Sequence, residues 1–381
     1  MGPSVIKSAV AQLQTIEQAL NGAFFERADA IRAVLVALLA GEHVVLLGPP
    51  GTAKSELARS VSQCVVDAAG TGLSFFEYLA TRFLTPDDLF GPVDLVAYET
   101  GEYRRILAGR MADSDLIFFD ECFKASGASL NLLLTLLNER VFHNGRTRVT
   151  APLITMIGAS NELPDGDESA ALWDRYLLRI TIGYLKTDWM AMMQRSSGAA
   201  AMPTVSRADV LALQGVVDQV TVPPAMFQAL AIFKAALAAE GIESSDRRWR
   251  KSLNILRAHA LMDGRTVVNE DDLDMLRHVM WNAANEISKV AKIVGKIGNP
   301  KVAHYLDLVD AAMLVFQNLK DALVRVQDPG EQGKLVIAAY GKMRTTRDQL
   351  NTLDADVTGR KVTTARTQFN TAFREITDQV M

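Results

Sequence analysis

The sequence has few of the features that mark secreted, membrane-bound or metal-stapled proteins. It contains only two cysteines in 381 residues, Cys64 and Cys122, so neither a disulfide framework nor a cysteine metal site is expected. The longest apolar run, Ala33–Ala40, is too short to span a bilayer. Lys7 and Gln12 interrupt the first segment, so no secretory signal is expected there. Together these absences favour a protein of the reducing cytoplasm, without a membrane span.

The chain also lacks a strong excess of either charge. It has 40 Lys and Arg against 44 Asp and Glu, a net charge of −4. This balance argues against a protein that coats nucleic acid, so no nucleic-acid partner is expected. Hydrophobic residues make up 49% and charged residues 22%, ordinary values for a globular chain with a sizeable core. The length suggests two or three domains.

Strands alternate with helices through the first half of the chain. Short apolar runs at 44–47, 116–119 and 153–157 are typical of parallel strands that are buried on both faces. Between and before them, apolar residues recur at helical spacing. The alternation predicts an α/β domain over residues 1–190, with a parallel sheet flanked by helices.

The second half of the sequence predicts helices alone. Residues 191–206 are rich in small residues and proline and form a predicted linker. Residues 207–294 show helical periodicity and form a predicted all-α lid. Residues 295–381 contain three amphipathic patterns, interrupted at Asp328-Pro329-Gly330, and predict a C-terminal helical bundle or arm.

A phosphate-binding loop follows the first predicted strand and opens a helix. Its sequence is Gly48-Pro49-Pro50-Gly51-Thr52-Ala53-Lys54-Ser55. Successive backbone N–H groups in such a loop form an anion site at a helix N-terminus. Lys54 is expected to reach the β- and γ-phosphates of ATP or ADP, and the Ser55 hydroxyl to bind Mg²⁺. Ala53 takes the place of a usual glycine and is tolerable if its φ stays negative; Glu56 completes the predicted nucleotide-binding stretch.

Two acidic residues end the second apolar strand. Asp120 and Glu121 therefore belong to the carboxyl edge of the sheet, where ligands of such folds bind. Asp120 is expected to hold Mg²⁺ through water, and Glu121 to act as general base on the attacking water. Asn161 follows the third strand, which should pair beside the Asp120 strand, and can orient that water without adding charge.

Two groups of arginines suggest that chains cooperate. Arg175 and Arg179 follow a helix that starts near Asp167, and either could be placed against the γ-phosphate of a neighbouring molecule, with Arg175 preferred. Arg247 and Arg248 open a lid helix, and one of them could reach the nucleotide from the lid. Which of the two points inward is left open, and Trp249 is expected to anchor that helix in the core.

In this order and spacing the motifs resemble the MoxR branch of the AAA+ ATPases, over roughly Phe24–Val294. The resemblance assigns Walker A to Gly48–Ser55, Walker B to Phe118–Glu121 and sensor 1 to Asn161. It also assigns the arginine finger to Asp174–Arg179 and sensor 2 to Ser245–Trp249, and it makes Ala53 usual. Two insertions fit the same branch: a helix-2 insert at about 90–110, and a hairpin at about 138–150 that carries the turn signal Asn144-Gly145.

This resemblance implies a homohexameric ring that remodels, activates or matures other proteins, with ATP and Mg²⁺ as cofactors. It also implies a partner that carries a von Willebrand factor A (vWA) domain, whereas the client stays unidentified. Two alternatives remain open: a nucleic-acid-dependent motor of the same clade, and a nucleotide-gated scaffold with little turnover. A motor would need DNA for turnover and would bind it with a steep salt dependence, while a scaffold would bind ATP tightly and barely hydrolyse it.

Overall fold

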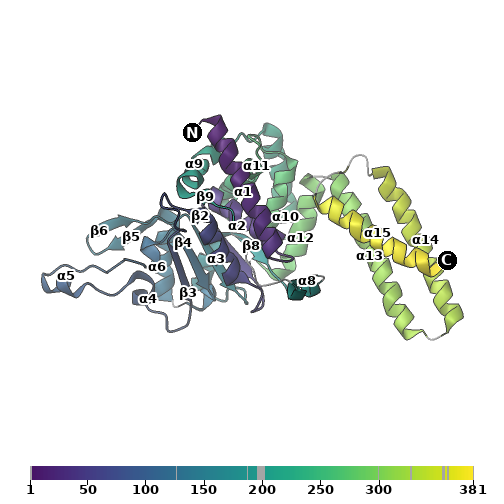
Figure 1. Cartoon of the computed structure of the whole chain (residues 1–381), viewed down its shortest axis with the longest axis horizontal. Coiled ribbons are helices and arrows are strands. Elements are labelled where there is room, and N and C mark those ends of the chain that lie inside the picture. The colour runs from purple at the N-terminus through teal and green to yellow at the C-terminus, as the bar shows by residue number, and fades with distance from the viewer. Residues whose placement is uncertain are drawn as a thin grey trace. The chain divides into compact units, whose positions relative to one another are not determined.

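The computed structural model describes residues 2–125, 127–186, 188–194, 202–298, 300–326, 328–353, 357 and 360–380 (Figure 1). Contacts divide the chain into two compact units, Met1–Gln228 with Gly241–Ile287, and Ala229–Glu240 with Ser288–Met381. This division passes through the predicted lid, because most lid residues pack with the predicted α/β domain. The boundaries at 190, 206 and 294 therefore stay a prediction, and residues 195–201 of the predicted linker lie outside the described residues.

A five-stranded parallel sheet forms the centre of the first unit. The strand order is β3-β4-β7-β1-β8. The strands are β1 (His43–Leu47), β3 (Phe75–Leu79), β4 (Leu116–Asp120), β7 (Thr155–Ser160) and β8 (Tyr176–Thr181). The three predicted strands correspond to β1, β4 and β7, and every residue of β1 and β7 is buried, as their apolar runs require. The predicted pairing of β7 beside β4 is confirmed.

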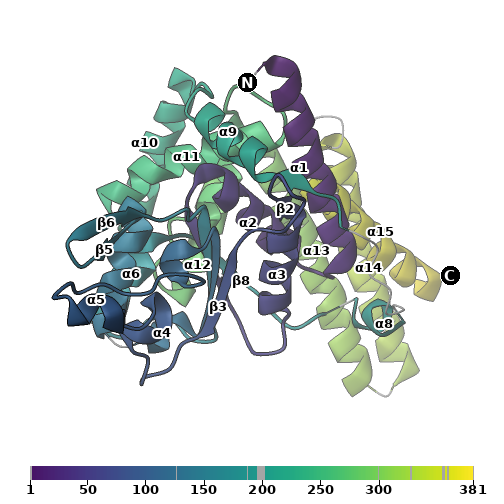
Figure 2. The same cartoon turned by 60° about the vertical axis from the view of Figure 1, so that its left-hand side comes forward.

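Helices surround this sheet, and the predicted α/β class is confirmed. The helices whose bounds lie in the first unit are α1 (Pro3–Ala23), α2 (Ala28–Ala40), α3 (Lys54–Cys64), α4 (Pro86–Phe90), α5 (Leu95–Glu99), α6 (Gly127–Glu139), α7 (Asp167–Arg175), α8 (Trp189–Gln194), α9 (Arg207–Val217) and α11 (Asp246–Met262). Helices α2 and α3 pack directly on the sheet, and α1 lies along α2, α9 and α11 (Figure 1, Figure 2). Gly41 ends α2 at φ +64, the left-handed conformation that glycine adopts most readily. A two-stranded pair joins β2 (Val65–Val66) to β9 (Val205–Ser206).

The predicted hairpin is present, and it is bonded to the segment predicted as the helix-2 insert. The hairpin consists of β5 (Val141–Asn144) and β6 (Thr147–Thr150). Its two-residue loop is Gly145-Arg146, so the predicted turn at Asn144-Gly145 is wrong by one residue. The side chain of Asn144 instead bonds the backbone N–H and carbonyl of Arg105 in the insert, at 2.6 and 3.0 Å. These two bonds hold Asn144 in β5, so the turn begins at Gly145.

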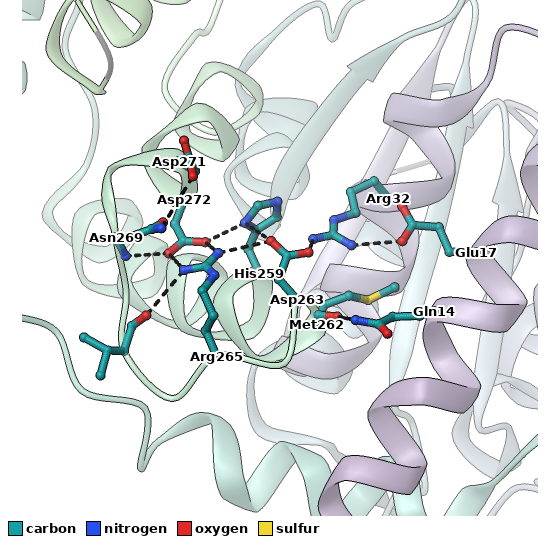
Figure 3. Close-up of polar contacts among 11 residues, drawn as sticks. Gln14, Glu17, Arg32, His259, Met262, Asp263, Arg265, Asn269, Asp271 and Asp272 are labelled. Atoms are coloured by element: carbon teal, nitrogen blue, oxygen red, sulfur yellow. Dashed lines mark hydrogen bonds and ion pairs between the residues drawn. The ribbon is translucent and has the colours of Figure 1, made fainter. Parts of the chain in front are cut away.

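An ion-pair network fixes the C-terminal end of α11 against the N-terminal helices (Figure 3). Arg32 bridges Glu17 of α1, at 2.9 Å, and Asp263 just after α11. The fully buried carboxylate of Asp272 accepts bonds from Arg265 at 2.7 and 2.8 Å and contacts Nδ1 of His259 at 2.7 Å. The ligand atoms of His259, Asp263 and Asp272 lie within 4.8 Å of one another. Because two guanidinium groups already neutralise the carboxylates, the cluster is a structural network of charges rather than a cation site.

Replacing Asp272 with Asn is expected to lower the free energy of unfolding by about 3 kcal/mol, because it leaves the Arg265 charge without its buried partner. Burial alone would raise the pKa of Asp272, but the bonds from Arg265, His259 and Asn269 lower it. The wild-type network therefore stabilises the fold above the carboxylate's unfolded pKa and loses this effect as pH falls through the lowered folded value. The variant should lack that acid dependence.

Urea unfolding, followed by tryptophan fluorescence, measures this effect, since all four tryptophans lie in the first unit. The exposed neighbour Asp271 provides the control, and Asp271→Asn should change stability by less than about 0.5 kcal/mol. Equal stabilities of the Asp272→Asn and Asp271→Asn proteins would contradict the assignment.

The second unit contains the predicted C-terminal helical bundle. The cut between the units passes through α10 (Pro224–Ala239), and α12 (Ile287–Gly298) precedes three long helices. These are α13 (Pro300–Arg325), α14 (Pro329–Leu353) and α15 (Arg360–Val380), and each contacts the other two. Their shared core includes Tyr305, Met343 and Phe369. Among the described helices, none combines the length and apolar character needed to cross a membrane.

Candidate functional site

The predicted phosphate loop connects β1 to α3 and is tightly anchored at its start. The backbone N–H of Gly48 donates to the carbonyl of Ser160 in β7, at 2.9 Å. A Cβ on Gly48 would lie 1.9 Å from the carbonyl oxygen of Ile182, so only glycine fits there. Inside the loop, the Thr52 hydroxyl donates to the carbonyl of Pro49, at 2.9 Å. Pro50, Ser55 and Glu56 complete the predicted stretch, and Glu56 is exposed on the first turn of α3.

Lys54 lies folded over this loop. Its ammonium donates to the carbonyls of Gly48 and Pro49, at 2.8 and 2.9 Å. Burial lowers the pKa of Lys54, while the negative charges of Asp120 and Glu121 act in the opposite direction. The lysine therefore lies within electrostatic reach of both carboxylates, as expected for groups that serve one ligand.

Ala53 departs from the sequence-based expectation. Its φ is +63, in the left-handed region, so the condition under which alanine would be free of strain is not met. The loop has to turn at this point to open α3, and the methyl group of alanine makes that conformation costly by about 1–2 kcal/mol. The strain is local, because Ala53 is the residue immediately before the helix.

Ala53→Gly is expected to raise the free energy of unfolding by about 0.5–1 kcal/mol, since glycine adopts positive φ without strain. Gly51→Ala provides the matched opposite change: Gly51 has φ +76 and open space where a Cβ would lie, so only backbone strain is added. It should lower stability by about 1 kcal/mol. Urea unfolding of both variants checks the pair, and a destabilising Ala53→Gly would contradict the strain.

The acidic pair lies beside the loop at the carboxyl edge of β4. Asp120 is the last residue of that strand, and Glu121 follows it at φ +49. The Asn161 amide, with its nitrogen toward Glu121, lies 2.7 and 3.1 Å from the two carboxylate oxygens. Lys124 lies 3.2 Å from the same carboxylate. The structure thus brings together Lys54, Asp120, Glu121 and Asn161 from three different loops.

Three of the predicted arginines, Arg175, Arg247 and Arg248, lie at the other edge of the sheet, whereas Arg179 lies within β8. Tyr176, directly after Arg175, pairs with His43 at the start of β1, whereas the phosphate loop follows the end of β1. Strand β1 has five residues, so these edges are roughly 13 Å apart before any loop is counted. From α11, Lys251 bonds Glu42 just before β1, at 2.5 Å, which places the start of that helix at the same edge.

Each arginine has a distinct environment. Arg248 is buried and bonds Asp174 at 3.2 Å and Asn282 at 2.7 Å, whereas Arg247 is half-buried and bonds Asn138. Arg248 is thus the inward-pointing residue of the two. Trp249 is only half-buried, so the expectation that it anchors the helix in the core is wrong. Neither arginine is brought to the chain's own phosphate loop.

Arg175 and Arg179 differ sharply in access. Arg179 lies within β8 with its guanidinium fully buried, bonded to the carbonyl of Trp173 at 2.9 Å and to Trp281. It stacks on the Trp173 ring at 4.0 Å and so is enclosed by its own chain. Arg175 ends α7 and remains partly exposed; one of its terminal nitrogens donates to the carbonyl of Ala171 at 3.4 Å and lies 3.8 Å from the Asp174 carboxylate. Of the two predicted fingers, Arg175 is the one available to a neighbour.

Comparison with known families accounts for this arrangement. Residues 11–216 match the family described as the MoxR domain in the MoxR–vWA–β-propeller ternary systems, and residues 225–294 match the AAA lid domain. The chain belongs to the MoxR family of AAA+ ATPases. An uncharacterised protein of Methanocaldococcus jannaschii is 36% identical over 290 residues, which cover 75% of this chain and 76% of that protein.

Further relatives support this MoxR assignment. A second uncharacterised protein of the same archaeon is 33% identical over 315 residues, covering 82% of this chain and 80% of the relative. Protein MoxR of Paracoccus denitrificans is 29% identical over 180 residues, covering 45% of this chain and 50% of that protein. A solved structure from Cytophaga hutchinsonii, assigned as an ATPase, shares the fold with a TM-score of 0.62 at 18% identity, covering 77% and 95% of the two chains.

Two residues of this MoxR chain were missed by sequence reasoning. Arg27, just before α2, bonds the carbonyl of Thr52 in the phosphate loop, and Glu26 accepts from the backbone N–H groups of Lys186 and Asp188. Residues 26–30 and 180–183 line a cavity of about 250 Å³ beside them. No motif signals these contacts, because their partners are backbone groups more than twenty residues away.

Proposed function

We propose that this chain hydrolyses ATP and uses the energy to remodel, activate or mature a partner protein. The observation that supports the proposal best is the cluster of Lys54, Asp120, Glu121 and Asn161 at one edge of a parallel sheet. The backbone of residues 48–53 and Lys54 bind the phosphates, and the cavity at 26–30 and 180–183 takes the adenine. Mg²⁺ suits the oxygen donors of Ser55 and Asp120, and when bound it neutralises charge on the phosphates.

In this proposal Glu121 is the general base. Its carboxylate removes a proton from the water that attacks the γ-phosphate, and the Asn161 amide orients the carboxylate through its two contacts. Lys124, at 3.2 Å from the Glu121 carboxylate, adds a positive charge beside this base. Glu121 holds the proton until phosphate leaves.

We further propose that the chains assemble into a hexameric ring in which Arg175 completes the neighbour's site. The location of Arg175, Arg247 and Arg248 at the sheet edge opposite the phosphate loop supports contact with a neighbour's nucleotide rather than the chain's own. The Nε of Arg175 is buried and has no hydrogen-bond partner within the described residues. The partly exposed remainder of the side chain is the part that a neighbour's phosphate would contact.

The proposed partner carries a vWA domain, a suggestion that rests on the ternary systems named in the family description. Within the family the sequence resembles the regulatory ATPase RavA, but the described part of residues 295–381 is helical, without the β-rich insertion of that protein. The RavA decarboxylase partner is therefore not carried over. A cytoplasmic location is part of the proposal, supported by two buried free cysteines.

Turnover measurements separate this function from its two alternatives. Purified protein is assayed for phosphate release with and without duplex DNA at several salt concentrations, and for co-purification with a candidate vWA protein in ATP. A remodelling ATPase hydrolyses ATP without DNA and binds the partner in the ATP state. Turnover that requires DNA would favour the motor, and tight binding without phosphate release would favour the scaffold.

A further inference from the structure

The Arg27 guanidinium connects two walls of the candidate site. Its Nε donates to the carbonyl of Thr52 in the phosphate loop, at 3.3 Å. One terminal nitrogen donates to the carbonyl of Gly183, just after β8, at 2.9 Å. The other donates to the backbone carbonyl of its neighbour Glu26, also at 2.9 Å. Thr52 and Gly183 belong to segments separated by more than a hundred residues, so this one side chain fixes the spacing between them.

Arg27 is an unusual choice for a purely structural bridge. The residue is 8% exposed, and within the described part of the chain it forms no ion pair with a carboxylate. Burial lowers its pKa, and the charge of Glu26 only partly opposes this effect. Burying a cation without a bonded anion is costly, so proteins keep such a group where an anion is bound or where its fixed fork of donors is needed.

The two segments held by Arg27 lead to different parts of the candidate site. Thr52 directly precedes Ala53, the residue in the left-handed conformation that opens α3 at Lys54. Gly183 lies in the wall of the cavity at residues 26–30 and 180–183, which Arg27 itself also lines. The positive charge of Arg27 further lowers the pKa of Lys54, so the two cations are close.

Glu26 extends the same connection. Its backbone has φ +53, and its carboxylate accepts from the N–H groups of Lys186 and Asp188, at 2.9–3.0 Å. The segment after β8 is therefore held at two points, by Arg27 at residue 183 and by Glu26 at residues 186 and 188. This leaves the wall little freedom to move independently of the phosphate loop.

We propose that Arg27 is a positioning residue of the nucleotide site: it fixes the distance between the base cavity and the phosphate loop, so that one nucleotide engages both. The inference rests on the proposed ATP site and adds the residue that joins its two halves. Two linked subsites bind a matching ligand far more tightly than they bind its separate parts, provided that their spacing is correct. Loss of the Arg27 bridge should therefore weaken the binding of ATP much more than the binding of either half of ATP.

The test compares Mg²⁺–ATP with its two halves, adenosine and Mg²⁺–tripolyphosphate, as competitors of a fluorescent ATP analogue on the full chain. In Arg27→Gln, ATP affinity should fall about 10- to 100-fold, while the affinities of adenosine and tripolyphosphate each change by less than about threefold. Arg27→Lys keeps the charge but cannot bond two carbonyls with a planar fork, so it should lose ATP affinity to a similar extent.

Controls make the other outcomes decisive. Arg59→Gln removes an exposed arginine on α3 that pairs with Glu77, and it should leave all three affinities unchanged. The inference would be overturned if Arg27→Gln lowered the affinities for ATP and tripolyphosphate by the same factor, or if Arg27→Lys kept the wild-type affinity for ATP. Either result would mean that Arg27 contributes only its charge. If the melting curve of Arg27→Gln shows that this variant is unfolded, the three affinities of Arg27→Lys are compared with those of the wild type instead. If wild type binds no ATP, or Lys54→Ala does not weaken it, the proposed function fails instead.

Discussion

Replacing Glu121 with Gln is expected to lower ATP turnover by about 10²- to 10⁴-fold while ATP stays bound. The substitution keeps the size of the side chain but removes the group that accepts a proton from water. Because Lys54 and the loop at 48–53 are untouched, phosphate binding should persist. Single-turnover phosphate release and equilibrium binding of Mg²⁺–ATP measure the two effects separately.

Glu162→Gln is the matched control for this experiment. Glu162 is an exposed carboxylate next to Asn161, at the same edge of the sheet, and its side chain takes no part in the proposed hydrolysis. It should hydrolyse ATP at the wild-type rate. Unchanged turnover in Glu121→Gln would remove Glu121 from the role of general base, whatever its distance from Asn161.

Arg175→Ala is expected to reduce turnover by about 10³- to 10⁵-fold, the range in which an arginine supplied by a neighbour contributes to phosphoryl transfer. Since Arg175 lies at the sheet edge opposite the chain's own phosphate loop, ATP affinity should be nearly unchanged. The exposed Arg250, near the start of α11, provides a control of the same residue type, and Arg250→Ala should retain activity. Steady-state hydrolysis and ATP binding test both variants.

Mixing Arg175→Ala with Glu121→Gln chains tests whether the arginine acts between chains. At an interface where the first variant supplies Glu121 and the second supplies Arg175, every proposed group is present. Some activity should therefore return on mixing. Hydrolysis that stays at the level of the separate variants would place the finger elsewhere or within one chain.

The sequence predicted the elements whose patterns are local. Continuous apolar runs predicted β1, β4 and β7, and the residues that follow them had to meet at one edge because parallel strands share a direction. Strand β8 was missed because Arg179 stands in its middle. A buried arginine is acceptable there because its guanidinium bonds the carbonyls of Trp173, Tyr176 and Trp281 and the side chain of Asn282, which no local pattern signals. Strand β3 was missed because it is an edge strand with mixed burial.

Other features depended on contacts that no pattern encodes. The hairpin turn moved by one residue because Asn144 bonds the backbone of Arg105, thirty-nine residues away. Arg247 and Arg248 lie at the edge of the sheet where β1 starts because α11 packs there. A motif within one helix does not determine where that helix packs. Arg27 escaped notice for the same reason, since its partners are carbonyls of Thr52 and Gly183.

The most direct test of the account is a density map of the Glu121→Gln protein with Mg²⁺ and ATP. The account predicts one nucleotide per chain, with its terminal phosphates against Lys54 and a metal ion between the Ser55 hydroxyl and Asp120. A nucleotide bound away from residues 48–55, or saturating ATP that leaves this edge of the sheet empty, would contradict it.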